Sequence, residues 1–273
     1  MLEGEAMSDA ILFSVDEGMA RLTLNRPTRL NAFNADLAHA WKDVTAEATS
    51  RADVKAILLD ASGPAFCAGG DVIDMATTMG SSSGADITAL AEVINAGIRS
   101  LTESSVPVVA AAHGTTAGGG LGILLCSDYA VVGSRSRLGS LYANIGLTPD
   151  LSVSAQLARA VGQRRALQLV LQDRLLTAQE AVEWGLVAEA VEGEDAAAEA
   201  ERVRARGEEI ARFWLAGAAD AYGQAKHLVR SQPERSFVEQ LSEEARSIGA
   251  ALETPDAQAR VAAFAAASAR RSV

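Results

Sequence analysis

The sequence predicts an α/β core followed by a helical C-terminal region. Short apolar runs of strand length alternate with longer segments of helical periodicity as far as residue 193. Beyond that point the pattern is helical and strand-like runs stop. The chain has 273 residues, which suits one large domain with an appendage. We therefore divide it into a core over residues 1–193 and a helical region over residues 194–273.

Turn-forming and helix-capping residues mark where the elements of the core begin and end. Strands are expected at 11–25 (two, joined by a turn at Asp16–Gly18), 54–61, 107–114, 128–139 (a pair) and 186–191. Helices are expected at 35–50 with Asn34 as N-cap, at about 87–103, at 151–173 as two helices broken at Gly162, and from Thr177 to Gly185 behind a capping box. Loops are expected at 26–34, 62–71 and 77–86, and the last of them is expected to be mobile.

The composition argues against several classes of protein. The formal net charge is −11, which disfavours a nucleic-acid groove because such a groove needs clustered Lys and Arg. No apolar run reaches the roughly 20 residues that span a bilayer, and the first residues lack the pattern of a signal peptide. Cys67 and Cys126 stand in apolar runs, which favours reduced core thiols and a cytoplasmic protein. Without a P-loop, a dinucleotide fingerprint or metal-ligand spacing, we expect no metal and no redox cofactor.

Two glycine-rich segments, FCAGGD (66–71) and TTAGGGLG (115–122), each follow a buried apolar strand. Backbone N–H groups at the start of a helix lack an intrahelical partner and favour negative charge. Two such groups that point at one position can stabilise an oxyanion. The alternative is that each segment is only a tight turn packed against its neighbour. The occurrence of two such segments, each after a strand, favours the functional interpretation.

Six stretches occur in the order found in one enzyme family. They are LNRPTRLNAFN, AFCAGGD, PVVAAAHGTTAGGGLGILLCSD, IGLTPD, ARAVGQRRALQLVL and AVEWGLVAEAV. Through them, residues 11–268 resemble the enoyl-CoA hydratase/isomerase (crotonase) family. The resemblance implies a crotonase-like spiral of strand–strand–helix turns, with a C-terminal region that supports homotrimers or dimers of trimers. Apolar residues of that region, such as Ile210, Phe213 and Leu215, would form the trimer contacts.

The resemblance also implies a substrate and candidate binding residues. The substrate is an acyl-CoA thioester, and no further cofactor is implied because CoA is part of the substrate. The backbone N–H groups of Gly70 and Gly119 would hold the thioester oxygen as an enolate forms. The residues that would lie along the bound CoA are Arg29, Leu30, Ala68, Asp71 and Val72. Lys226 resembles a C-terminal lysine that reaches a CoA phosphate; a position on a solvated helix face is the alternative.

The hydratases of this family carry two glutamates, and the aligned positions here are Gly122 and Tyr142. Adding water needs a base and an acid near one water molecule, so efficient hydration is not expected. The next acidic residue is Asp150, where some relatives place their only catalytic carboxylate. Asp150 could also be the N-cap of a helix that starts at residue 151. Tyr142 could line the acyl pocket, orient Asp150 or only pack.

These residues favour an acyl-CoA isomerase in which Asp150 moves a proton through a thioester enolate, either in a double-bond shift or in the rearrangement of a ring epoxide. The GLxPD form resembles the ring-epoxide isomerases of phenylacetyl-CoA breakdown. One alternative is a hydratase with displaced acid and base, and another is a non-catalytic acyl-CoA-binding protein. A dehalogenase-like attack of Asp150 on an aryl ring is disfavoured, because Tyr142 and Asn95 replace the Trp and His that support it. The remaining candidates are interpreted as structural or surface residues: Asp128, His113, His39, His227, Cys67 and Cys126.

Overall fold

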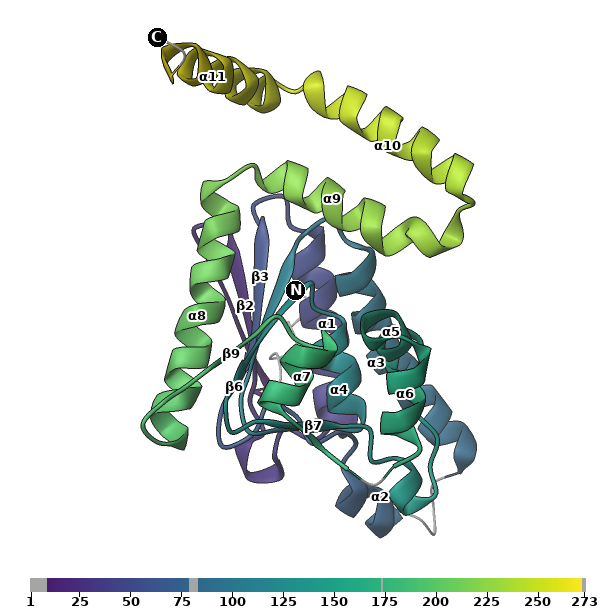
Figure 1. Ribbon diagram of the computed structural model, residues 1–273. Coiled ribbons are helices and arrows are strands. Elements are labelled where there is room, and N and C mark those ends of the chain that lie inside the picture. The colour runs from purple at the N-terminus through teal and green to yellow at the C-terminus, as the bar shows by residue number, and fades with distance from the viewer. Residues whose placement is uncertain (1–8, 79–82, 173, 272–273) are drawn as a thin grey trace, which may run out of the picture.

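Two β-sheets form the frame of the computed structural model, which describes residues 9–78, 83–172 and 174–271 (Figure 1). The larger sheet has the strand order β1-β2-β3-β4-β6-β9, and the smaller sheet has the order β5-β7-β8. The strands of the larger sheet are β1 (Ile11–Asp16), β2 (Met19–Leu24), β3 (Ala56–Ala61), β4 (Val108–Ala112), β6 (Tyr129–Gly133) and β9 (Glu189–Val191). Those of the smaller sheet are β5 (Thr115–Ala117), β7 (Arg137–Gly139) and β8 (Leu176–Thr177). Pairing is parallel except between β1 and β2 and between β7 and β8.

The chain repeats one path: a strand of the larger sheet, a short strand of the smaller sheet, then a helix. β4 leads into β5 and α4 (Gly119–Leu125), and β6 leads into β7 and then α5 (Val153–Val161) and α6 (Gln163–Val170). The predicted spiral of strand–strand–helix turns is confirmed. The strand pair predicted at 128–139 is wrong as a pair, because β6 bonds to β4 and β9 while β7 bonds to β5 and β8.

Helices cover both faces of the larger sheet (Figure 1). Helices α1 (Ala35–Ser50), α3 (Gly84–Glu103) and α4 contribute to the main apolar core on one face. On the other face, α8 (Ala196–Ala216) packs Val203 and Ala211 against Leu58 and Val109. Helix α8 is therefore part of the core, and the boundary predicted at residue 193 does not separate it from the sheet.

The last helices differ in how closely they approach the core. Helix α9 (Ala219–Ser231) runs across one end of the larger sheet, whereas α10 (Phe237–Leu252) and α11 (Pro255–Arg271) stand away from it (Figure 1). Helices α10 and α11 expose large apolar side chains: Phe237, Val238, Leu241, Ile248, Leu252, Val261 and Phe264. Ile210 and Leu215 are partly buried within this chain, where they pack against the apolar cluster beneath α8.

Most of the predicted helix ends are correct. Asn34 accepts a hydrogen bond from Leu37 N at 3.0 Å, a capping box opens α7 (Ala178–Trp184), and Gly162, with φ 77°, separates α5 from α6. The expected loop at 77–86 is wrong in part. Helix α2 (Val72–Thr78) extends into it, and α3 begins at Gly84 because Ser83 and Asp86 form a capping box. Residues 79–82 of that expected loop lie outside the described residues.

Three further features of the described chain bear on function. None of its helices combines the length and apolar character needed to cross a bilayer. The same residues include no group of three His, Cys, Asp or Glu side chains placed to hold a metal ion. Cys67 and Cys126 are buried free thiols, as predicted, and burial raises the pKa of each to about 12. Neither thiol is therefore a nucleophile near neutral pH.

Candidate active site

The two glycine-rich segments lie against each other beyond the ends of β3 and β4. Ala117 N donates to the Cys67 carbonyl at 3.0 Å. Gly69 has φ 103°, and a Cβ atom on it would lie 3.0 Å from Ala117 O and 3.1 Å from Gly119 N. Only glycine allows two backbones to approach this closely in such a conformation. The two segments therefore form one continuous surface.

This contact places Gly70, the residue after Gly69, near the N–H group of Gly119. Gly119 is the first residue of α4, so its N–H has no partner within the helix. The neighbouring Asp71 N donates to Phe33 O at 2.9 Å, which fixes the backbone beside Gly70. In the part of the chain that the structure describes, neither glycine N–H donates to a backbone carbonyl. Both groups can donate to a ligand.

A phenol–carboxyl pair lies next to Gly119. The Tyr142 hydroxyl oxygen is 3.6 Å from the position of a Cβ atom on Gly119, and it donates a 2.5 Å hydrogen bond to Oδ1 of Asp150. Helix α5 begins at Val153, with Ser152 at its N-cap position. The alternative that Asp150 caps a helix starting at residue 151 is therefore wrong, because its carboxyl group bonds to Tyr142 instead.

The surroundings of this pair change its proton affinities. Partial burial raises the pKa of the Asp150 carboxyl group, because desolvation penalises the charged form. The hydrogen bond from Tyr142 acts in the opposite direction, since it stabilises the carboxylate. Burial, and then the charge of Asp150, raises the pKa of the Tyr142 phenol. Tyr142 therefore keeps its proton and remains a hydrogen-bond donor to Asp150.

Gly122 faces the turn that leads into α5. Leu151 and Ser152 in this turn have positive φ angles of 45° and 70°. The turn places Leu151 O 1.9 Å from the position of a Cβ atom on Gly122. A side chain at residue 122 therefore does not fit unless the backbone moves. The resemblance to the family aligns the two hydratase glutamates with Gly122 and Tyr142. The Leu151 carbonyl leaves no room for a side chain at residue 122, and residue 142 carries a phenol instead of a carboxyl group.

Gly122→Ala is expected to lower the free energy of unfolding by about 1–3 kcal/mol, the usual cost of overpacking a core, because the new methyl group meets the Leu151 carbonyl. Denaturant unfolding measures the loss. Gly249→Ala in α10 is the matched control, since nothing lies within 4 Å of the added methyl group and alanine favours the helix by about 0.5–1 kcal/mol. Equal changes in the two variants would contradict the packing argument.

The residues predicted to lie along CoA are neighbours in the structure. Arg29 ends the short helix η1 (Pro27–Arg29), and Leu30 follows it with a partly exposed side chain. Ala68 N donates to Leu30 O at 3.0 Å, which joins this turn to the first glycine-rich segment. Val72 begins α2 beside Asp71 and is half exposed. Arg29, Leu30 and Val72 therefore border the Gly70 side of the site.

The Asp71 side chain has a different role from the one predicted. Its buried carboxylate accepts hydrogen bonds from Arg29 Nη2 at 2.6 Å, Arg26 Nη2 at 3.2 Å and Asp74 N at 3.1 Å. Burial alone raises the pKa of Asp71, but these hydrogen bonds outweigh it and the pKa is lowered. Asp71 thus anchors two arginines with a carboxylate that is almost fully buried. Arg26 was missed, although the RPTR spacing places it one turn from Arg29.

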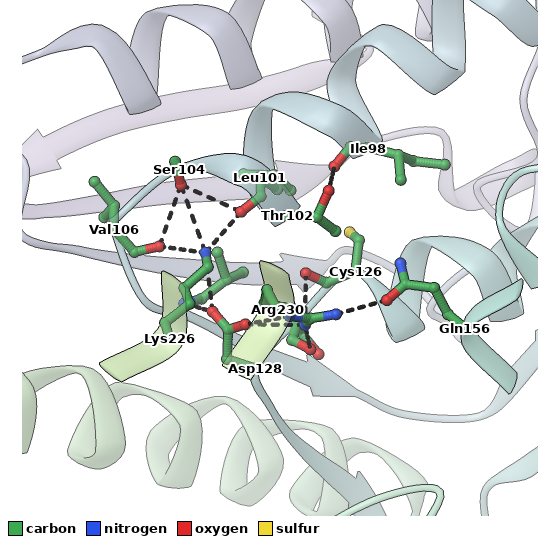
Figure 2. A network of polar contacts seen from close by, with 12 residues as sticks. Ile98, Leu101, Thr102, Ser104, Val106, Cys126, Asp128, Gln156, Lys226 and Arg230 are labelled. Carbon is green, nitrogen blue, oxygen red and sulfur yellow. Dashed lines mark hydrogen bonds and ion pairs between the residues drawn. The ribbon is translucent and has the colours of Figure 1, made fainter. Parts of the chain in front are cut away.

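Lys226 is not placed to bind a CoA phosphate, nor does it lie on a solvated face (Figure 2). Its buried ammonium donates to Leu101 O at 2.6 Å and Val106 O at 2.7 Å, and it pairs with Asp128 at 3.0 Å. Burial lowers the pKa of Lys226, and the charge of Asp128 opposes that change. The predicted role is corrected: Lys226 fastens α9 to the ends of α3 and β4.

Two other residues have the structural roles expected of them. Asp128 Oδ2 accepts a hydrogen bond from Val108 N at 2.9 Å, which joins the start of β4 to the segment between α4 and β6. The Nε2 atom of buried His113 lies 2.7 Å from Gly63 O, across the turn after β3. His39 is exposed on α1, and His227 is half-buried on α9.

The two-sheet spiral, with a glycine-rich segment after each of two neighbouring strands, makes this chain a crotonase-fold protein. The sequence model of the Enoyl-CoA hydratase/isomerase family matches residues 14–268. The chain belongs to that family.

Relatives with different named activities are similar to this chain. The 1,2-epoxyphenylacetyl-CoA isomerase of Escherichia coli strain K12 is 32% identical over 201 residues, which cover 72% of this chain and 75% of the relative. The probable enoyl-CoA hydratase of Rhodobacter capsulatus is also 32% identical, over 93% of this chain and 94% of its own. The crystal structure of an enoyl-CoA hydratase/isomerase from Mycobacterium abscessus has a TM-score of 0.87 at 29% identity, covering 94% of this chain and 96% of that one.

Proposed function

We propose that this protein is an acyl-CoA isomerase that works through a thioester enolate. The observation that carries the proposal is the pairing of Asp150 with Tyr142 next to Gly119, at a site where Gly122 has no room for a glutamate. One carboxyl group can remove a proton and return it, which is sufficient for isomerisation. Hydration needs a base and an acid at one water molecule, and the second group is missing here.

In the proposed double-bond shift, the Asp150 carboxylate removes a proton from the carbon next to the thioester of a 3-enoyl-CoA. The electron pair moves into the thioester carbonyl, and the Gly70 and Gly119 N–H groups hold the resulting enolate oxygen. The protonated Asp150 then returns its proton two carbons further along, which gives the 2-enoyl-CoA with no net change in atoms. Removing one such N–H donor costs about 2.7–4 kcal/mol in other enzymes, so both glycines should matter as much as the base.

The surrounding residues support binding of the CoA portion. Arg29 lies at the edge of the site with its guanidinium held by Asp71, and Leu30 and Val72 offer exposed apolar side chains beside it. We infer that CoA lies along Arg29, Leu30, Ala68 and Val72. An arginine held by one carboxylate keeps further N–H donors for a phosphate.

A panel of CoA thioesters tests the proposal. The enzyme is incubated with trans-3-hexenoyl-CoA, trans-2-hexenoyl-CoA, a ring-epoxide phenylacetyl-CoA and 4-chlorobenzoyl-CoA, and the products are followed by mass and absorbance. Isomerisation leaves the mass unchanged and alters conjugation, whereas hydration adds the mass of one water. Turnover only of the 2-enoyl thioester with gain of water would replace the proposal with the hydratase alternative. Binding of thioesters without turnover would support the non-catalytic alternative.

Tyr142→Phe is expected to move the acid limb of the pH–rate profile to higher pH. The base must be ionised, so activity falls as the pH drops through the pKa of Asp150. The lost hydrogen bond had stabilised the carboxylate, so its removal raises that pKa further. A hydrogen bond to a charged group is worth about 1.5–3 kcal/mol, so its loss should displace the acid limb measurably. Tyr129→Phe, which removes a hydroxyl bonded to Glu189 on β9, is the control. An acid limb that stays in place in Tyr142→Phe would show that Asp150 is not the titrating base.

We propose that the isolated protein is a trimer or a multiple of three. Helices α10 and α11 expose apolar side chains that a monomer would leave in water. Light scattering at micromolar concentration measures the assembly, and Ile248→Glu in α10 is expected to reduce its mass. A stable monomer of the unmodified chain would contradict this expectation.

A further inference from the structure

Arg230 of α9 joins the two helices that carry the candidate site (Figure 2). Its Nη2 donates to Ser127 O at 2.5 Å and to Cys126 O at 3.4 Å, at the C-terminal end of α4. Its Nη1 donates to Oε1 of Gln156 in α5 at 2.6 Å. Asp128 Oδ1 fixes the same guanidinium through Nε at 3.0 Å and Nη2 at 2.9 Å. One side chain thus holds the end of α4 against α5.

Gln156 continues this connection to the turn before α5. Its Nε2 donates to Oγ of Ser152 at 3.3 Å, and its backbone N donates to Ser152 O at 2.8 Å. Ser152 and Leu151 have positive φ angles, which residues other than glycine keep only where the surroundings hold them. Gln156 is buried, so its two side-chain contacts are shielded from water. Arg230 and Gln156 therefore brace the turn.

This turn relates the two halves of the site to each other. Asp150 immediately precedes it, and Leu151 within it packs against Gly119, with its Cδ1 2.6 Å from the position of a Cβ atom there. Gly119 begins α4, and the opposite end of α4 is the end that Arg230 holds. A movement of α5 relative to α4 would change the spacing between the Gly119 N–H and the Asp150 carboxyl group.

We propose that Arg230 and Gln156 are positioning residues that fix the spacing between the Gly119 N–H and the Asp150 carboxyl group. The inference rests on the proposed function, which gives those two groups their roles. Arginine suits this position because it offers five N–H donors in a rigid planar fork, whereas lysine offers a single mobile ammonium. Because Arg230 belongs to α9, the C-terminal helical region contributes to the geometry of the reaction without touching substrate.

Four variants test the inference with trans-3-hexenoyl-CoA as the probe. Arg230→Lys and Gln156→Met are each expected to lower kcat by about 10- to 10²-fold with KM nearly unchanged, because small misplacements at a reacting centre have effects of this size. The double variant is expected to have about the same kcat as the less active of the two single variants, since both changes break the same contact. Val203→Ala, which leaves a cavity beneath α8 on the opposite face of the sheet, is the control. It is expected to lower Tm and leave kcat unchanged.

The possible outcomes separate this inference from the proposed function. The positioning role is overturned if kcat stays unchanged in Arg230→Lys and Gln156→Met. It is also overturned if Val203→Ala loses as much kcat for the same drop in Tm as these two variants do. Strictly additive losses in the double variant would also overturn it. If Arg230→Lys fails to fold, Gln156→Met decides, because it leaves the pairing of Arg230 with Asp128 intact. If the unmodified enzyme isomerises neither trans-3-hexenoyl-CoA nor the ring-epoxide phenylacetyl-CoA, or if Asp150→Asn stays fully active, the proposed function fails and the positioning role fails with it.

Discussion

Asp150→Asn is expected to lower isomerase turnover by about 10²–10⁴-fold, the range typical of a general acid–base group, with little change in Tm. The amide cannot take up the proton that the carboxylate removes. Its oxygen can still accept the hydrogen bond from Tyr142, so the local packing is kept. The helix start is also unaffected, because the N-cap position of α5 is Ser152 and not Asp150.

Steady-state kinetics and thermal unfolding of the same preparations check this result. Asp36→Asn, at an exposed position in the first turn of α1, controls for the loss of a carboxylate elsewhere. The pH profile gives a second check. Burial raises the pKa of Asp150, so the unmodified enzyme should lose activity as the pH falls through a value above the ordinary range of aspartate. Full activity in Asp150→Asn would remove Asp150 from the mechanism.

Asp128→Asn is expected to destabilise the fold by about 3–5 kcal/mol, the cost of breaking a buried ion pair by removing one partner. The neutral amide would leave the Lys226 ammonium, which is 4% exposed, with the carbonyls of Leu101 and Val106 and the Ser104 hydroxyl but with no anionic partner. Arg230 would lose its carboxylate partner at the same time. Denaturant unfolding is expected to show a lower midpoint with an unchanged slope.

Asp220→Asn is the matched control for this second prediction. Asp220 lies in α9 and pairs with Lys55, just before β3, at 2.9 Å, so this ion pair also joins α9 to the core, but both of its side chains are well exposed. Exposed pairs contribute little to stability, so this variant should lose only a small part of what Asp128→Asn loses. Similar losses in the two variants would mean that burial does not govern the contribution of the Lys226 pair.

The structural features predicted correctly from the sequence depend on local patterns. A glycine-rich segment after an apolar strand can be recognised within about ten residues of sequence, and both segments meet in the structure. The caps at Asn34 and Thr177 are equally local, since each bonds within its own first turn. The position of Asp150 beside these segments came from the resemblance to the family, and its partner Tyr142 was one of several possibilities for that residue.

Most of the errors concern contacts between segments far apart in the chain, although the capping box that starts α3 at Gly84 is local. The helical pattern around Lys226 gives its place on α9, but not that this face meets the carbonyls of Leu101 and Val106. The N-cap hypothesis for Asp150 failed because Leu151 and Ser152 adopt positive φ angles that neither residue type favours. These angles depend on packing against α4, which no local pattern reveals. The extent of the core beyond residue 193 was missed for the same reason, since α8 alternates polar and apolar residues like a free surface helix.

The two N–H groups at Gly70 and Gly119 belong to the main chain, and this has a consequence for mutational tolerance. No single substitution can delete a backbone N–H unless it introduces proline. Inactivating changes at this half of the site should therefore be those that displace the backbone, such as a side chain at Gly69, where the neighbouring segment leaves no space. Residues 142 and 150, by contrast, supply only side chains. Divergence within such a fold can exchange those side chains, and with them the reaction, while the backbone that we propose binds the thioester carbonyl stays the same.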